Sequence, residues 1–176
     1  MKYMLGLLLV ASIVGIALVS QPAHAEIVIT EAQMERIRNT CIENQATLNR
    51  LHQTDAFLRN DRGNLYRTIS DKLMVPFNRR LASNQLDGSK FLTITADYNK
   101  AYTKFYDAYI EYDNAMVKLL AVDCVKQPVS FYNALLEARA KRVALSSVNQ
   151  VITGLIKEYQ ATFTTFKASF LKESSL

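Results

Sequence analysis

Apolar side chains recur at alternating steps of three and four residues through most of the chain after residue 30. This spacing places them on one face of an α-helix and, over several heptads, is typical of helices that pack lengthwise against one another. Only five glycines and three prolines are present, which leaves few positions for the turns of a β-protein. The sequence therefore predicts an all-α fold. The repeat positions are Met34, Ile37, Cys41, Asn44, Leu48, Leu51, Asp55, Leu58, Arg62, Leu65 and Ile69 in the first segment, Phe91, Ile94, Tyr98, Ala101, Phe105, Ala108, Tyr112, Ala115, Leu119 and Val122 in the second, and Phe131, Leu135, Ala138, Arg142, Leu145, Asn149, Ile152, Ile156, Tyr159, Phe163, Phe166 and Phe170 in the third.

Capping and turn residues mark the ends of the predicted helices. Thr30 is a suitable N-cap, and Gln33 follows three residues later, as in a capping box. The sequence Asn-Gln-Leu-Asp-Gly-Ser at 84–89 predicts the first turn, and residues 126–128 predict the second. Pro128 suits the first position of the last helix. Within the first segment, Pro76 should kink the helix because it removes a backbone donor, while Gly63 could divide it into two helices.

Two cysteines, Cys41 and Cys124, distinguish the resulting topologies. In an oxidising compartment an even pair of cysteines usually forms a disulfide, and bridged Cα atoms lie within about 7 Å of each other. A hairpin at Gly63 would give a four-helix bundle in which the two cysteines lie at different heights. In a bundle of three long helices that run up, down and up, the heights of the two cysteines differ by about 13 Å. A kink at Pro76 and an irregularity near Gly63 can remove this difference. We therefore expect an elongated, coiled-coil-like three-helix bundle with a long kinked first helix, and the four-helix bundle is the alternative.

Polar residues interrupt the repeats at matching heights on different helices. When Cys41 and Cys124 are placed at the same height along the bundle axis, two polar residues of the first helix lie at the heights of two polar residues of the last helix. We expect these side chains to form buried polar layers, which often fix the register of packed helices rather than add net stability. The layers are an Asp55–Arg142 ion pair and an Arg62–Asn149 hydrogen bond, with Tyr109 and Tyr112 nearby.

The first 25 residues have the three parts of a secretory signal peptide. Lys2 precedes an apolar run over residues 5–19, and Ala23-His24-Ala25 supplies a cleavage pattern of small residues. We expect cleavage after Ala25, a single helical domain over 26–171 and a frayed tail at 172–176. The protein would then be exported, to the periplasm or the outside of the cell. If the segment is not cleaved, it becomes an N-terminal membrane anchor.

The composition argues against enzymatic and nucleic-acid-binding roles. A formal net charge of +5 is modest, and the basic clusters are too short for a nucleic-acid stripe. The part after Ala25 contains one histidine, His52, which we expect at the surface beside Asp55. Neither a nucleophile elbow nor a Glu-x-x-His pair is present. We therefore expect no catalytic residue, no cofactor and no metal.

Tyrosines are concentrated in the second helical segment. The heptad positions predict that Tyr102 and Tyr109 flank the core and that Tyr106 points outwards, either as a tyrosine-rich edge of the core or as an aromatic surface for a partner. Tyr132 and Arg139 form a smaller set at helical spacing in the last segment.

Residues 51–66 (LHQTDAFLRNDRGNLY) and 123–142 (DCVKQPVSFYNALLEARAKR) resemble exported helical-bundle proteins of unknown function from bacteria with very small genomes. The resemblance implies a helical architecture and no particular activity. We expect a non-catalytic exported protein that binds a protein partner at the cell envelope or outside the cell. The alternatives are an extracytoplasmic holdase chaperone and, with an uncleaved signal, a membrane-tethered stalk.

Overall fold

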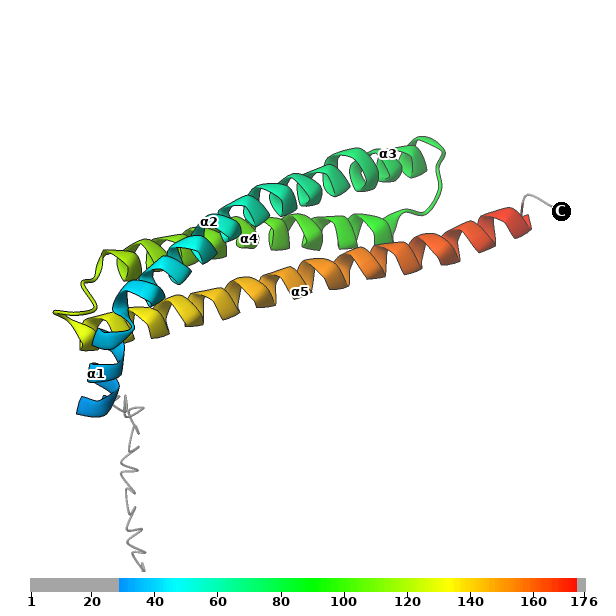
Figure 1. Ribbon diagram of the computed structural model, residues 1–176. Helices are drawn as coiled ribbons and strands as arrows, with labels where there is room; N and C mark the ends of the chain where they lie inside the picture. Colours follow the sequence, from blue (N-terminus) through cyan, green and yellow to red (C-terminus); the bar gives the residue numbers. More distant parts are fainter. Residues whose placement is uncertain (1–28, 174–176) are drawn as a thin grey trace, which may run out of the picture.

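The computed structural model describes residues 29–173, and every element within this range is helical. A short helix α1 (Glu31–Asn39) precedes α2 (Cys41–Thr68), which continues through the π-helix η1 (Ile69–Met74) into α3 (Val75–Ser83). The chain then returns along α4 (Ser89–Ala121) and turns again into α5 (Pro128–Glu173). Figure 1 shows an elongated arrangement in which these long helices lie side by side. The prediction of an all-α fold is confirmed.

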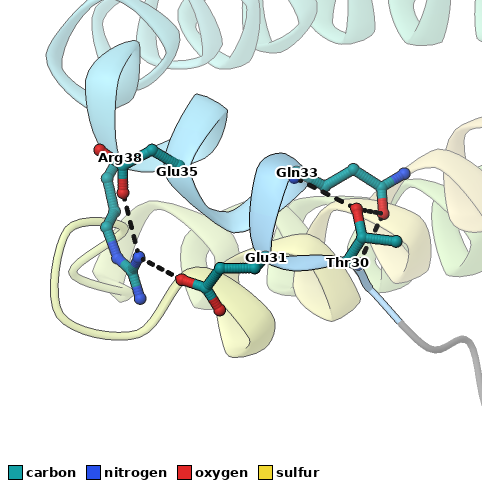
Figure 2. A network of polar contacts seen from close by, with 5 residues as sticks. All are labelled: Thr30, Glu31, Gln33, Glu35 and Arg38. Carbon is teal, nitrogen blue, oxygen red and sulfur yellow. Dashed lines mark hydrogen bonds and ion pairs between the residues drawn. The ribbon is translucent and has the colours of Figure 1, made fainter.

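The capping box predicted at the start of the first helix is present. The Thr30 Oγ1 atom accepts a hydrogen bond from the backbone N–H of Gln33 at 3.3 Å, and the Gln33 side chain accepts one from the backbone N–H of Thr30 at 2.8 Å (Figure 2). Arg38 pairs with Glu31 and Glu35 along the same short helix. The α1 helix ends at Asn39 with Thr40 as its C-cap, where the sequence predicted a continuous helix, and α1 contacts α5.

Gly63 lies inside α2, and the helix continues through it. The irregularity expected near Pro76 takes the form of a π-helical segment just before the proline. Because Pro76 has no N–H and its ring crowds the carbonyl of residue 72, a normal α-helical turn cannot be completed there. The wider π-turn relieves this conflict. Ser70, inside η1, is buried and donates a hydrogen bond to Asn99 of α4 at 2.8 Å, which anchors the segment.

Both predicted turns lie at the expected positions. The first separates α3 from α4 and contains Gln85 with a φ of 57°. The second separates α4 from α5, and the Asp123 carboxylate accepts hydrogen bonds from the backbone N–H groups of Val125 and Lys126. Pro128 begins α5 as predicted. The α5 helix continues to Glu173, beyond the predicted domain end at residue 171, and it projects past the α3–α4 turn (Figure 1).

The α4 helix lies at the centre of the arrangement and contributes most of the buried side chains. The core has two parts, one towards the α4–α5 turn and one towards the α3–α4 turn. In the first part Cys41 and Cys124 form the predicted disulfide, with Cα atoms 5.6 Å apart and both residues buried. The disulfide joins the start of α2 to the α4–α5 turn. The second part is centred on Tyr98, Phe105 and Ile152.

Candidate functional site

An open groove of about 1170 Å³ runs between α2 and α5, and we call it the central groove. Residues of α2 form one wall and residues of α5 form the other, while Phe105 and Tyr109 of α4 contribute the floor. Both walls pack against α4. The groove therefore exists because α4 separates α2 from α5 over this stretch. Its lining consists of Asp55, Leu58, Arg59, Arg62, Leu65, Tyr66, Phe105, Tyr109, Arg139, Arg142, Val143, Leu145, Ser146, Asn149, Gln150, Thr153, Gly154, Ile156 and Lys157.

Apolar side chains in the central groove remain open to solvent. The exposed fractions of Leu58, Leu65 and Val143 are 45%, 55% and 66%. Leu58 and Leu65 belong to the apolar repeat that the sequence assigned to packing between helices. No helix covers them within the described part of the chain, so the repeat on α2 is only partly used for the core. Val143 lies outside the repeat, and sequence reasoning missed it.

The groove is strongly basic. Its lining contains five cationic side chains and one carboxylate, that of Asp55. Arg142 pairs with this carboxylate, and the other four cations form no ion pair within residues 29–173. They line both walls, Arg59 and Arg62 on α2 and Arg139 and Lys157 on α5.

Arg59 lies where the α2 wall meets the floor of the groove. Its guanidinium carbon lies 4.7 Å from the centre of the Tyr109 ring, a cation–π arrangement. The Arg59 Nε atom is buried and has no hydrogen-bond partner among the described residues. Burial raises the pKa of the Tyr109 hydroxyl, and the nearby Asp113 carboxylate acts in the same direction. The contact with Tyr109 therefore fixes the Arg59 guanidinium next to the groove floor.

The predicted Asp55–Arg142 ion pair is present, with Arg142 Nε 3.4 Å from Asp55 Oδ2. The expectation that both partners are buried is wrong for Arg142: its side chain is 52% exposed, against 12% for Asp55. Arg142 lies at the groove wall, where water reaches it. The buried partner of Asp55 is Tyr112, whose hydroxyl donates a hydrogen bond to Oδ2 at 2.6 Å. Burial, together with this hydrogen bond, raises the pKa of Tyr112 far above that of a free tyrosine.

The second predicted polar layer is wrong. Arg62 is exposed, and Asn149 accepts a hydrogen bond from the Tyr66 hydroxyl at 3.1 Å instead. Because α2 and α5 are separated here by the central groove, Arg62 extends into the open space rather than across a closed interface. Tyr66, which the sequence did not assign to any layer, fills the core position.

His52 is paired with a residue of another helix. Its Nε2 atom lies 2.7 Å from Asp113 Oδ1 of α4, and its side chain is 20% exposed. The expected neighbour on the same helix, Asp55, is engaged by Tyr112 and Arg142 instead. His52 therefore links α2 to α4.

The tyrosines of α4 pack inwards rather than forming an exposed stripe. Tyr106 was predicted to point outwards, but its hydroxyl lies 3.0 Å from that of Tyr102, and the Tyr102 hydroxyl donates to the Gly63 carbonyl at 3.3 Å. Tyr109 is buried at the groove floor. On α5, Tyr132 is half-buried, and Arg139 is exposed on the groove wall. Of the predicted partner surface, Tyr109 and Arg139 therefore share one site.

Within residues 29–173, no three His, Cys, Asp or Glu side chains gather as a metal site requires. In the same range no helix combines the length and the apolar character needed to cross a membrane. The predicted signal segment, residues 1–25, lies outside the described residues. Comparison with known protein families, curated proteins and solved structures finds no match for this chain.

Proposed function

We propose that this protein is a non-catalytic, exported binding protein that holds a partner protein in the central groove. The observation that carries the proposal is the exposure of Leu58, Leu65 and Val143 in a concave surface lined by unneutralised cations. Exposed apolar side chains that are rimmed by polar residues mark interaction sites on soluble proteins. A rigid, disulfide-linked helical frame suits such a role, because it presents the site without rearrangement.

Site-specific photocrosslinking tests the proposal in the cells that produce the protein. A photoreactive phenylalanine analogue at Val143 should crosslink to a defined partner. The matched control is Val117 on α4, which is 53% exposed but lies outside the groove. The binding role is overturned if Val143 and Val117 give the same crosslinks.

Export is supported by the buried disulfide, which is compatible with an oxidising compartment. The non-reduced intact mass of the native protein, taken separately from medium and membrane fractions, tests this part. A soluble species that begins at Glu26 and retains the disulfide fits export with cleavage. A full-length species in the membrane fraction would instead make the protein a tethered stalk.

A holdase chaperone is the second candidate, favoured by the open apolar lining of the groove. A holdase would suppress aggregation of several unrelated unfolded clients at stoichiometric amounts. A binding protein for one partner would not do so, because its groove selects by charge as well as by apolar contact.

We also propose that the bundle has three arms, with α1 as an appended short helix. The uninterrupted run of α2, η1 and α3 supports this description, and so does the continuation of α2 through Gly63. The four-helix bundle, for which the sequence analysis required a break at Gly63, is the alternative.

A further inference from the structure

We propose that the central groove binds an amphipathic α-helix whose apolar stripe is flanked on both sides by acidic residues. This inference rests on the proposed function and names the chemistry of the partner. It follows from the shape of the groove, from the positions of its apolar side chains and from the distribution of its charges.

The shape fits a helix. Between Arg139 and Lys157 the α5 wall covers 18 steps of the chain, about 27 Å at the rise of an α-helix. The floor and both walls are themselves helical. A helix laid between α2 and α5 would pack against both of them in the way helices of a bundle pack on their neighbours.

The apolar side chains fit the same occupant. Leu58 and Leu65 are seven residues apart on α2, so this wall presents one apolar position per heptad, and the exposed Val143 lies on the α5 wall. Such positions face a partner helix in packed bundles. Since Leu58 and Leu65 are about half exposed, the repeat on α2 is complete only when another helix covers it.

The charges determine the flanks of the occupant. Arg59 and Arg62 stand on one wall, while Arg139 and Lys157 stand on the other. A helix that lies in the groove therefore meets cations on both sides of its apolar stripe. Acidic residues on both flanks would pair with them, as charged residues beside an apolar seam do in coiled coils.

Other anionic occupants fit less well. A bilayer surface is flat on this scale and cannot reach the floor formed by Phe105 and Tyr109. Residues 1–25 of the chain have an apolar run but contain no Asp or Glu, so they lack the complementary charge. A helix with two acidic edges can pack its apolar stripe on the groove floor and pair its acidic residues with the cations of both walls.

Fluorescence anisotropy with two designed peptides tests the inference. Both are about 18 residues long and share one leucine stripe; the flanking positions are glutamate in one peptide and lysine in the other. We expect the glutamate peptide to bind the intact, disulfide-linked protein at least about tenfold more tightly. The double variant Arg59→Glu/Arg139→Glu leaves three cations and three carboxylates in the groove, so it should bind the two peptides about equally. The matched control Arg79→Glu/Arg80→Glu makes the same charge change at exposed positions of α3 and should keep the preference for the glutamate peptide.

Loss of the preference differs from misfolding, because the folded double variant should still bind both peptides through its apolar lining, whereas a misfolded protein would bind neither. Equal binding of the two peptides to the unsubstituted protein, or equal effects of the two double variants, would overturn the inference. So would Arg59- and Arg139-dependent binding to anionic phosphatidylglycerol vesicles without binding to the glutamate peptide. If Val143 crosslinks a partner in cells but the peptide preference is absent, the inference fails and the proposed function stands. If Val143 crosslinks nothing specific, the proposed function itself fails.

Discussion

The Tyr112 hydroxyl donates a hydrogen bond to the Asp55 carboxylate at 2.6 Å and thereby joins the C-terminal part of α4 to the middle of α2. Arg142 of α5 reaches the same carboxylate at 3.4 Å. Three helices therefore meet at one carboxylate at the end of the central groove. Tyr112 is buried, whereas half of the Arg142 side chain is exposed, so the two contacts to Asp55 differ in energy.

Substitution of Asp55 should destabilise the protein mainly through Tyr112. Asp55→Ala leaves a buried hydroxyl without its acceptor, which should lower the free energy of unfolding by about 1–3 kcal/mol. Arg142→Ala should have a smaller effect, because water already solvates the arginine. The control Asp97→Ala removes an exposed carboxylate that pairs with Lys100 and should change stability by less than about 0.5 kcal/mol. Urea unfolding of the three variants measures the loss of unfolding free energy in each. Equal losses in Asp55→Ala and Asp97→Ala would contradict the predicted ranking.

Removal of the disulfide should destabilise the bundle more than any of these substitutions. Cys41 and Cys124 are 83 residues apart in the sequence, and closing a loop of this length in the unfolded chain is worth about 4–5 kcal/mol in the chain-entropy model. Cys41→Ser/Cys124→Ser should therefore lower Tm by about 10 °C or more in calorimetry. Because Cys124 is fully buried, mild reductant should act slowly on the folded protein. An unchanged Tm in the double variant would show that the disulfide does not constrain the unfolded chain.

Two helical glycines should respond oppositely to alanine. A Cβ at Gly154 meets nothing within 4 Å, so Gly154→Ala should stabilise the protein by about 0.5–1 kcal/mol through helix propensity. A Cβ at Gly63 would lie 2.8 Å from the Tyr106 hydroxyl, so Gly63→Ala should lose this gain or become destabilising. Thermal melts of both variants test the contrast. In a Tyr106→Phe background, Gly63→Ala should recover part of the gain, and a lack of recovery would contradict the proposed clash.

Stability should fall at alkaline pH because buried tyrosines resist ionisation. Burial raises the pKa of Tyr159 to about 12, whereas an unfolded tyrosine titrates near 10. The folded state then binds more protons than the unfolded state between these values, so stability is full below about pH 10 and decreases as the pH rises towards 12. Melting curves across this range measure the slope. Tyr159→Phe should reduce it, and an unchanged slope would refute the assignment to Tyr159.

The heptad repeat predicted the helical class, turn-forming residues predicted both turns, and the pair of cysteines predicted the disulfide, because each of these signals is local in the sequence or depends on residue type. They could not predict the central groove. Leu58, Arg62 and Leu65 occupy repeat positions that a closed bundle would bury, and only the placement of α4 between α2 and α5 leaves them open.

The polar contacts show the same limit. The heights of the heptad positions correctly predicted the contact between Asp55 and Arg142. The same reasoning wrongly paired Arg62 with Asn149, which accepts a hydrogen bond from Tyr66 instead. The break at Thr40 was also missed. A sequence repeat gives the height of a residue, while the separation of two helices depends on the volume of the side chains between them.

The most direct test of partner binding in the groove is the identity of the peptide crosslinked to a photoreactive residue at position 143 in the producing cells. We predict one partner segment with helical apolar spacing and acidic flanks, with a crosslink yield that falls in Arg59→Glu/Arg139→Glu and not in Arg79→Glu/Arg80→Glu. Crosslinks to many unrelated segments, or a yield that both double variants leave unchanged, would contradict the role of the central groove.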